Sequence, residues 1–298
     1  MNVADSQTVT SRRVARVSSN RAARFSGKRM LAHLGIIIVG AIMLYPPLWM
    51  LSSAFKPTQL IFSEPGLWPR EWTLSNFAEG FTALGIPFSV FFLNSAIVAA
   101  LSVIGNLFSC SLAAYVFARL EFRLKPVLFA LMLGTIMLPF QVVLVPQYIL
   151  FHAIDWTNTF LPLVVPKFLA VDSFFVFLLV QFIRGLPREL DDAATVDGCG
   201  PIGVFWRIIL PLMKPALAVT AVFTFIWTWN DFLGPLIYLT ATENYTVPIA
   251  LNAFLDSTGT SAWGAMFAMS VLSLVPLFLV FLFAQKQLVQ GIATTGLK

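Results

Sequence analysis

Charged side chains are scarce in this sequence. Asp, Glu, Lys and Arg make up 11% of its 298 residues, against about 25% in a typical soluble domain, while the residues AVILMFWYC reach 58%. A chain with so few charges cannot cover its surface with polar groups in water. The composition therefore excludes a soluble globular protein and predicts several apolar helices of about twenty residues that cross a bilayer.

Cysteine and histidine are also rare, with two of each. Cys110 lies in an apolar run and Cys199 in a polar segment, so no disulfide framework is predicted. Each cysteine is interpreted as a small apolar residue. His33 is interpreted as an interfacial residue, because no second type of metal ligand lies at a useful spacing.

Several catalytic and nucleotide-binding motifs are missing. A phosphate-binding G-x-x-x-x-G-K-[ST] loop is absent, because Gly27-Lys28 is followed by Arg29 and lacks the leading glycine. The sequence also contains no H-E-x-x-H and no G-x-S-x-G. We therefore predict no catalytic, cofactor or metal site in this chain, and expect ATP to be bound by a partner if it is used.

Apolar segments account for most of the chain. The first is predicted at residues 30–56 and precedes a loop at 57–87. A core at 88–285 holds five further spans, at about 88–118, 126–150, 159–184, 215–239 and 262–284, and a tail follows at 286–298. Prolines and glutamines inside the third span predict a broken helix or a wetted surface.

The fourth span contains two opposite charges, Lys167 and Asp172. Five residues apart on a regular helix they lie about 140° round the axis, so we expect them to be poorly placed to pair. An alternative is that the regular helix starts late, with Asp172 as its N-cap and Lys167 at the outer interface.

Basic residues set the expected orientation. Residues 1–29 carry seven of them against Asp5, which predicts a disordered segment that touches anionic lipid; a transit peptide is the alternative. Six spans place all lysines and arginines except Lys56, Arg70 and Lys167 on one side. The positive-inside rule makes that side the cytoplasm, with both termini in it. The net charge of +5 therefore reflects topology, and no nucleic-acid partner is predicted.

One polar segment, 186–214, interrupts the apolar chain on this predicted cytoplasmic side. Pro187 suits the first turn of a helix, and the acids Glu189, Asp191 and Asp192 follow where the helix dipole favours them. Gly198 is placed to end that helix in a left-handed cap. Pro201 then starts a second helix, in which Ile202, Phe205 and Ile209 share one face until Pro211 ends it.

The segment resembles the EAA signature of permease subunits of ABC importers. That signature is an acid and two alanines, three residues, glycine, nine residues and Ile-x-Leu-Pro; here it reads Asp192, Ala193, Ala194, Gly198, Ile208, Leu210 and Pro211. Asp192 stands where the family usually has Glu, which shortens the side chain by one methylene. Further segments resemble the carbohydrate branch of the family, and specifically the second membrane subunit of the maltose system: Asn94-Ser95, Ala114-Tyr115, Arg119-Leu120, Trp229-Asn230-Asp231-Phe232 and Leu288-Val289-Gln290-Gly291.

The resemblance implies an all-α integral membrane protein of the type I ABC importer fold, located in the bacterial inner membrane. It implies a coupling helix at 188–198 that docks on a dimer of ATP-binding subunits through Glu189, Asp192, Ala193, Ala194, Asp197 and Gly198. A second permease subunit and an extracytoplasmic solute-binding protein are the other implied partners. The implied substrate is a sugar or related polyol.

Polar residues inside the predicted spans are candidates for the substrate path. Trp227, Trp229, Asn230, Asp231 and Asn94 combine aromatic faces with hydrogen-bonding groups, which suits sugars. The alternative role for the four residues of the fifth span is to pack or gate its outer end, and the alternative for Asn94 is hydrogen bonding between helices or capping. An ion-driven secondary carrier is the alternative function, and it predicts uptake that survives ATP depletion.

Overall fold

The computed structural model of the chain describes residues 27–256 and 262–295, and every regular element within these ranges is helical. The predicted disordered segment 1–29 falls outside the described residues except for its last three. The chain divides into two units, residues 1–49 and 50–298.

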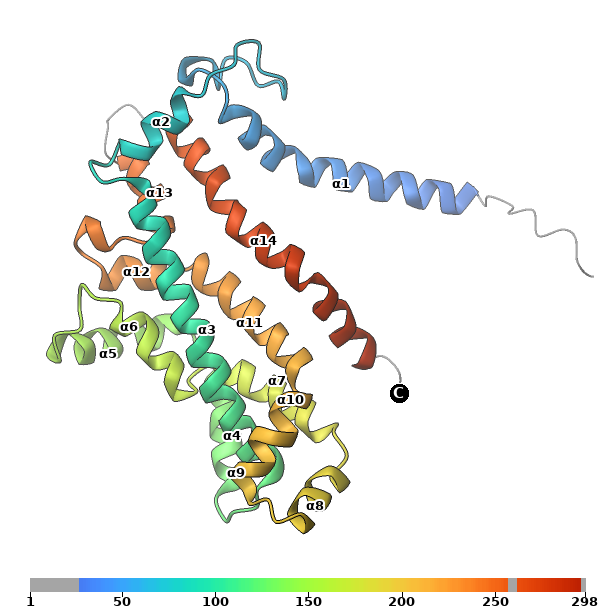
Figure 1. Cartoon of the computed structure of the whole chain (residues 1–298). Helices are drawn as coiled ribbons and strands as arrows, with labels where there is room; N and C mark the ends of the chain where they lie inside the picture. The colour runs from blue at the N-terminus through green and yellow to red at the C-terminus, as the bar shows by residue number, and fades with distance from the viewer. Residues whose placement is uncertain (1–26, 257–261, 296–298) are drawn as a thin grey trace, which may run out of the picture. The chain divides into compact units, whose positions relative to one another are not determined.

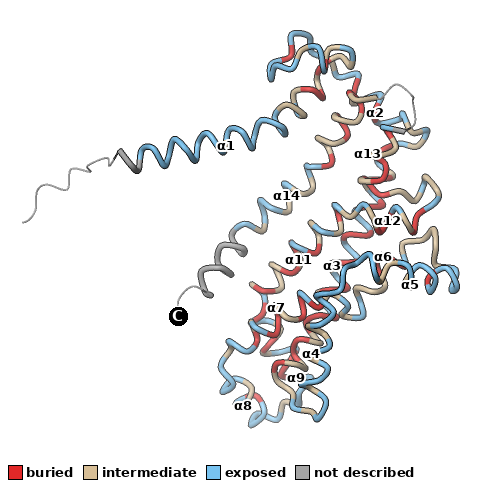
Figure 2. Tube along the Cα trace, turned by 180° about the vertical axis from the view of Figure 1, so that it is seen from behind, coloured by how far each residue is buried: buried red, intermediate tan, exposed pale blue. Residues whose placement is uncertain are grey.

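Helix α1 (Gly27–Ser53) supplies most of the described part of the first unit. Its apolar side chains are exposed along its length, from Met30 to Leu48 (Figure 2). Met30–Ser53 is long and apolar enough to cross a membrane, which agrees with the predicted first span. A helix with this surface needs lipid around it.

Four helical segments are long and apolar enough to span a bilayer: α1, α3 (Phe88–Arg119), Leu161–Arg184, and α14 (Trp263–Thr295) over Trp263–Gln285. Two bent pairs raise the number to six. Helices α4 (Lys125–Ile136) and α5 (Phe140–Ala153) meet at 102°, and Pro201–Leu212 meets α11 (Lys214–Trp229) at 75°. The all-helical fold is therefore confirmed, and the described residues provide six candidate spans if each bent pair crosses the bilayer once.

The third span is broken, which is one of the two alternatives that its prolines and glutamines predicted. Helix α4 ends at Ile136 and α5 starts after Pro139, which occupies the N-cap position. Proline lacks a backbone N–H and keeps the preceding residue out of the helical region, so the chain turns here.

The fourth span starts irregularly. Short helix α6 (Leu161–Val164) leads into the 3₁₀ segment η2 (Val165–Leu169), and Ala170 has a left-handed φ of 55°. Helix α7 (Ser173–Arg184) begins only after Asp172. The late start is confirmed, with Asp172 at the N-cap position, but its side chain makes no capping bond.

Helix α3 runs through the second unit from α2 (Ser75–Thr82) and α13 (Val247–Asp256) to α8 (Glu189–Val196) and α9 (Pro201–Val204) (Figure 1). Its 32 residues measure about 48 Å at 1.5 Å per residue. That exceeds the roughly 30 Å hydrocarbon core of a bilayer, so one end can emerge from it.

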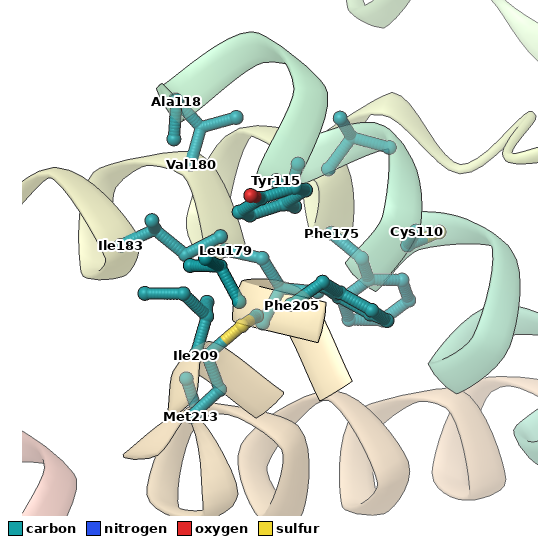
Figure 3. Packing of buried hydrophobic residues seen from close by; sticks show 14 of the residues in the cluster. Cys110, Tyr115, Ala118, Phe175, Leu179, Val180, Ile183, Phe205, Ile209 and Met213 are labelled. Atoms are coloured by element: carbon teal, nitrogen blue, oxygen red, sulfur yellow. The ribbon is translucent and has the colours of Figure 1, made fainter. Parts of the chain in front are cut away.

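Two apolar cores lie along α3. The inner core joins the second half of α3 to α7 and to the segment 194–216; Figure 3 shows Phe175, Leu179 and Ile183 packed with Phe205 and Ile209. The outer core joins the first half of α3 to α13 and α14 through Phe88, Phe91 and Met269.

The remaining short helices lie in the segments that connect the spans. Residues 57–87 contain η1 (Thr58–Leu60) and α2. The fifth span breaks at Asn230 and Asp231, and α12 (Leu233–Tyr238) and η4 (Thr242–Asn244) follow. Helix α14 continues to Thr295, well past the predicted end of the sixth span.

Candidate functional site

The polar segment 186–214 forms the predicted pair of helices at one end of the second unit (Figure 1). Helix α8 starts after Arg188 and carries Glu189, Asp191 and Asp192 in its first turn. Acids there are stabilised by the positive end of the helix dipole.

Gly198 ends α8 as predicted, with a φ of 85°. Its N–H donates to the Thr195 carbonyl (3.0 Å), and the Cys199 N–H donates to the Ala194 carbonyl (2.9 Å). These two bonds define a Schellman cap, which a residue with a Cβ adopts only with strain. The reversal fixes the direction in which the second helix leaves.

Helix α8 has two faces. Glu189, Asp192, Ala193 and Val196 are exposed and follow the spacing i, i+3, i+4 and i+7, which places them in one stripe. Asp197 and Gly198 are exposed beyond it. Ala194, the remaining predicted coupling residue, is buried in the chain's own inner core.

The second helix differs from the prediction in two respects. Ile202 is 76% exposed, whereas Phe205 and Ile209 are buried, so the expected common face is wrong. Ile202 lies before the wide π-type turn η3 (Phe205–Ile209), in which the Leu210 N–H donates to the Phe205 carbonyl, whereas Phe205 and Ile209 lie within this turn and pack in the inner core. Pro211 does not end the helix, because α10 (Leu210–Leu212) continues it.

Exposed apolar residues extend the stripe on α8. Val196 is 88% exposed, and Leu190, Ile202 and Trp206 are also exposed. Sequence reasoning missed these residues, although an apolar residue inside a polar segment was the available signal. Acidic and apolar side chains are therefore exposed side by side on this surface. Exposure of clustered apolar side chains to water is unfavourable and is typical of an interaction site.

Helix α3 holds this pair of helices through two side chains. The Arg119 Nε lies 2.7 Å from Asp191 Oδ2, and the Arg119 Nη2 donates to the Leu186 carbonyl at 2.9 Å. The Tyr115 hydroxyl donates to the Pro201 carbonyl at 2.9 Å. We call this set of contacts the α3 clamp. Burial raises the pKa of the Asp191 carboxyl, although the Arg119 guanidinium opposes that shift.

A cavity of about 660 Å³ lies where the broken third, fourth and fifth spans meet. Its polar lining includes Gln147, Lys167, Asp172 and Asp231, and its aromatic lining includes Trp227 and Tyr238. The volume falls within the range of small-molecule sites. Charged groups within membrane-spanning segments need protein or water around them.

Lys167 and Asp172 form an ion pair on the cavity wall, with Nζ to Oδ2 at 2.8 Å. The expectation that they are poorly placed to pair is wrong. It assumed a regular helix, whereas a 3₁₀ segment and the left-handed Ala170 lie between them and bring the side chains together.

Buried polar groups of α3 support this ion pair. Asn106, which is fully buried, donates to Asp172 Oδ2 at 2.5 Å and to Thr224 Oγ1 at 3.1 Å. The Ser109 hydroxyl donates to the Lys167 carbonyl at 2.6 Å. The cavity wall is therefore fixed to the middle of α3.

Only two of the five residues predicted for the substrate path line the cavity, namely Trp227 and Asp231. The Gly234 N–H donates to Asp231 Oδ1 at 3.2 Å, and Trp227 is half exposed. Gln147, one of the glutamines inside the third span, also lines the cavity.

The other three predicted residues lie elsewhere. Trp229 is buried and its Nε1 donates to the Ser273 carbonyl of α14 at 3.1 Å. Asn94 donates to the carbonyls of Glu243 (2.8 Å) and Tyr245 (2.9 Å). Asn230 is exposed and donates to the Ile226 carbonyl of its own helix. For Trp229 and Asn94 the packing alternative is the one that the geometry supports.

Among the described residues, no three His, Cys, Asp or Glu side chains are grouped closely enough to hold a metal ion. The site therefore consists of a surface, the exposed stripe of α8 with its neighbours, and a cavity in the spans.

Comparison with known proteins identifies the family. Residues 105–294 match the model of the binding-protein-dependent transport system inner membrane component. The chain is 36% identical over 254 residues to the probable ABC transporter permease protein YurM of Bacillus subtilis, covering 85% of this chain and 83% of that protein. It is 33% identical to the trehalose/maltose transport system permease protein MalG of Thermococcus litoralis, covering 91% and 97%.

A solved structure supports the fold. A bacterial ABC transporter involved in the import of the acidic polysaccharide alginate superimposes with a TM-score of 0.77 over 90% of this chain and 98% of that chain, at 19% identity. These relatives are transport permeases, not enzymes. The chain belongs to the family of binding-protein-dependent transport system inner membrane components, which are the permease subunits of ABC importers.

Proposed function

We propose that the chain is one of two membrane subunits of an ATP-driven sugar importer and that α8 is its contact with an ATP-binding subunit. The exposed stripe Glu189, Asp192, Ala193 and Val196 carries this proposal. A helix that is fixed on one face by its own chain and exposes apolar residues on the other is suited to enter a groove of a partner. The shorter Asp192 keeps the negative charge that the family places there.

ATP acts through the partner in this proposal. Binding of ATP closes the two ATP-binding subunits, α8 moves with them, and the spans change from inward-open to outward-open. The shift between these states is limited by the difference in binding free energy that the partner supplies. An extracytoplasmic solute-binding protein delivers the sugar from the other side.

A co-purification experiment tests the docking surface. Ala193→Arg places a large cation in the stripe, and we expect it to lower recovery of the ATP-binding subunit at least tenfold. Ala83→Arg is the matched control, because Ala83 is an exposed alanine outside this loop. Equal recovery with both variants would refute docking through α8.

The orientation of α8 follows the distribution of basic residues and is part of the proposal. Cys110 is buried and Cys199 is partly exposed, so a maleimide reagent reports on Cys199. We expect a membrane-impermeant maleimide to label inside-out vesicles and to leave intact cells unlabelled. Labelling of Cys199 from the external medium alone would place the loop on the wrong side.

We also propose that the cavity is part of the sugar path. Trp227 offers an aromatic face, while Gln147 and Asp231 offer hydrogen-bonding groups, the combination that sugars use. Relatives are named for arabinooligosaccharides, trehalose/maltose and diacetylchitobiose, which supports a neutral or N-acetylated oligosaccharide as the substrate class.

Transport by the assembled importer tests the cavity. Trp227→Ala is expected to lower sugar uptake about tenfold while leaving recovery of the ATP-binding subunit unchanged. Phe283→Ala, which truncates an exposed aromatic residue of α14, is the control. Uptake that persists after ATP depletion would instead favour a secondary carrier.

A further inference from the structure

The end of α3 contacts the loop that carries α8 through an ion pair and a hydrogen bond to a backbone carbonyl. Arg119 is the last residue of α3, its side chain is 6% exposed, and it reaches both the Asp191 carboxylate and the Leu186 carbonyl. The negative end of the α3 dipole thus meets the positive end of the α8 dipole, with a cation on the first helix and an acid on the second.

The α3 clamp holds the loop before, within and after α8. Leu186 precedes the helix, Asp191 lies in its first turn, and Pro201 follows its C-terminal turn. A rigid displacement of α8 must therefore either move α3 or break these contacts. The Tyr115 ring also packs on Phe205 of the second helix, with ring centroids 5.3 Å apart.

Stability alone does not explain a buried ion pair here. Removing two charges from water costs more than many ion pairs return, and apolar pairs of similar volume often stabilise a protein equally well. Burial raises the pKa of the Asp191 carboxyl and the Arg119 guanidinium lowers it, and the two side chains approach within 2.7 Å. We therefore interpret the ion pair as a contact that holds α8 against the end of α3, although removing the two charges from water costs free energy.

The clamp and the docking stripe occupy different faces of α8. Asp191 and Ala194, three residues apart, face the chain's own core, whereas Asp192, Ala193 and Val196 are exposed. A change in the clamp can therefore leave the docking surface in place.

Helix α3 also reaches the cavity. It is unbroken from Phe88 to Arg119, and its Asn106 and Ser109 bond to the Lys167 and Asp172 segment that lines the cavity. One rigid element therefore contacts both the coupling loop and the cavity wall.

We propose that Tyr115 and Arg119 are positioning residues that convert displacement of α8 into displacement of α3, and so couple the ATP-driven movement of α8 to opening of the cavity. This inference rests on the proposed function, because it requires an ATP-binding subunit on α8. It adds an intramolecular step behind the docking surface, with its own residues and its own test.

The test uses the assembled importer in proteoliposomes and measures sugar imported per ATP hydrolysed. The double variant Arg119→Met with Asp191→Leu replaces the ion pair by apolar side chains, and Tyr115→Phe removes only the hydroxyl. Arg123→Gln, at an exposed arginine four residues beyond Arg119, is the control. Recovery of the ATP-binding subunit is measured for every variant.

We expect the double variant to retain the ATP-binding subunit and ATP hydrolysis while sugar imported per ATP falls at least tenfold, with a fall of about twofold to threefold in Tyr115→Phe. An unchanged ratio in the double variant, or a parallel loss of hydrolysis and import in both variants, would overturn the coupling role. Failure of the unmodified chain to bind any ATP-binding subunit would instead overturn the proposed function.

Discussion

The two ends of α3 hold their neighbours by different chemistry. At the outer end, Asn94 donates to the carbonyls of Glu243 and Tyr245, and the Val247 N–H donates to Ser95 Oγ at 2.8 Å. At the inner end, an ion pair joins Arg119 to Asp191. Both ends bind backbone groups of a loop, but only the inner end uses opposite charges.

We interpret the contacts at the outer end of α3 as a structural connection. The α3 clamp at the inner end is the connection that we propose to move with α8. Neutral hydrogen bonds at the outer end satisfy backbone groups and lock the segment before α13. The charged pair at the inner end costs desolvation and holds a single geometry. The contact chemistry of α3 therefore differs between its two ends.

The largest expected effect comes from removing one partner of the inner ion pair. Arg119→Met leaves the partly buried Asp191 carboxylate without its cation, and we expect a loss of about 3 kcal/mol in the free energy of unfolding, the lower end of the range for buried pairs. Adding Asp191→Leu should restore most of that loss, because no unpaired charge remains. Equilibrium unfolding in detergent measures both variants, and additive losses would contradict the pairing.

A smaller effect is expected at the outer end. Asn94→Ala leaves two carbonyls without their donor and should cost about 1–3 kcal/mol. Sugar imported per ATP by the assembled importer should stay unchanged, in contrast to the clamp variants. A change in that ratio would abolish the distinction between the two ends.

Titration of Asp191 at the inner end is expected to make the stability of the protein depend on pH. The pKa of Asp191 is raised in the folded chain by burial, with Arg119, Asp192 and Arg188 as its charged neighbours. The folded state then binds more protons than the unfolded state at pH values above about 3.9, so this group's contribution to stability falls as pH rises through that window.

Asp191→Asn removes this titration. We expect a plot of unfolding midpoint against pH, from about 4 to 7, to decline less steeply in the variant than in the unmodified chain. Identical slopes would show that the Asp191 carboxyl does not titrate abnormally in the folded chain.

The smallest effect is expected from Ser95→Ala. The change removes the acceptor of one backbone N–H, that of Val247, and should cost about 1 kcal/mol. Thermal unfolding in detergent measures this loss. A loss as large as that of Asn94→Ala would contradict the smaller contribution expected of Ser95 at the outer end of α3.

The local pattern of the sequence determined much of this protein. Apolar run length predicted the spans, because a bilayer demands a helix of a given length. Glycine at 198 predicted the left-handed cap, and proline at 139 the broken third span, because each residue acts through its own backbone. The spacing of Asp192, Ala193, Ala194 and Gly198 identified the family.

Tertiary structure decided the contacts between distant segments. The Lys167 and Asp172 pair depends on a left-handed turn at Ala170 that no local rule indicated. Trp227 lines the cavity, whereas Trp229 packs on α14. The rotation of α11 against its neighbours decides this difference. Arg119 finds Asp191 only when α3 and α8 meet, because long-range pairing is set by packing and leaves no periodicity in the sequence.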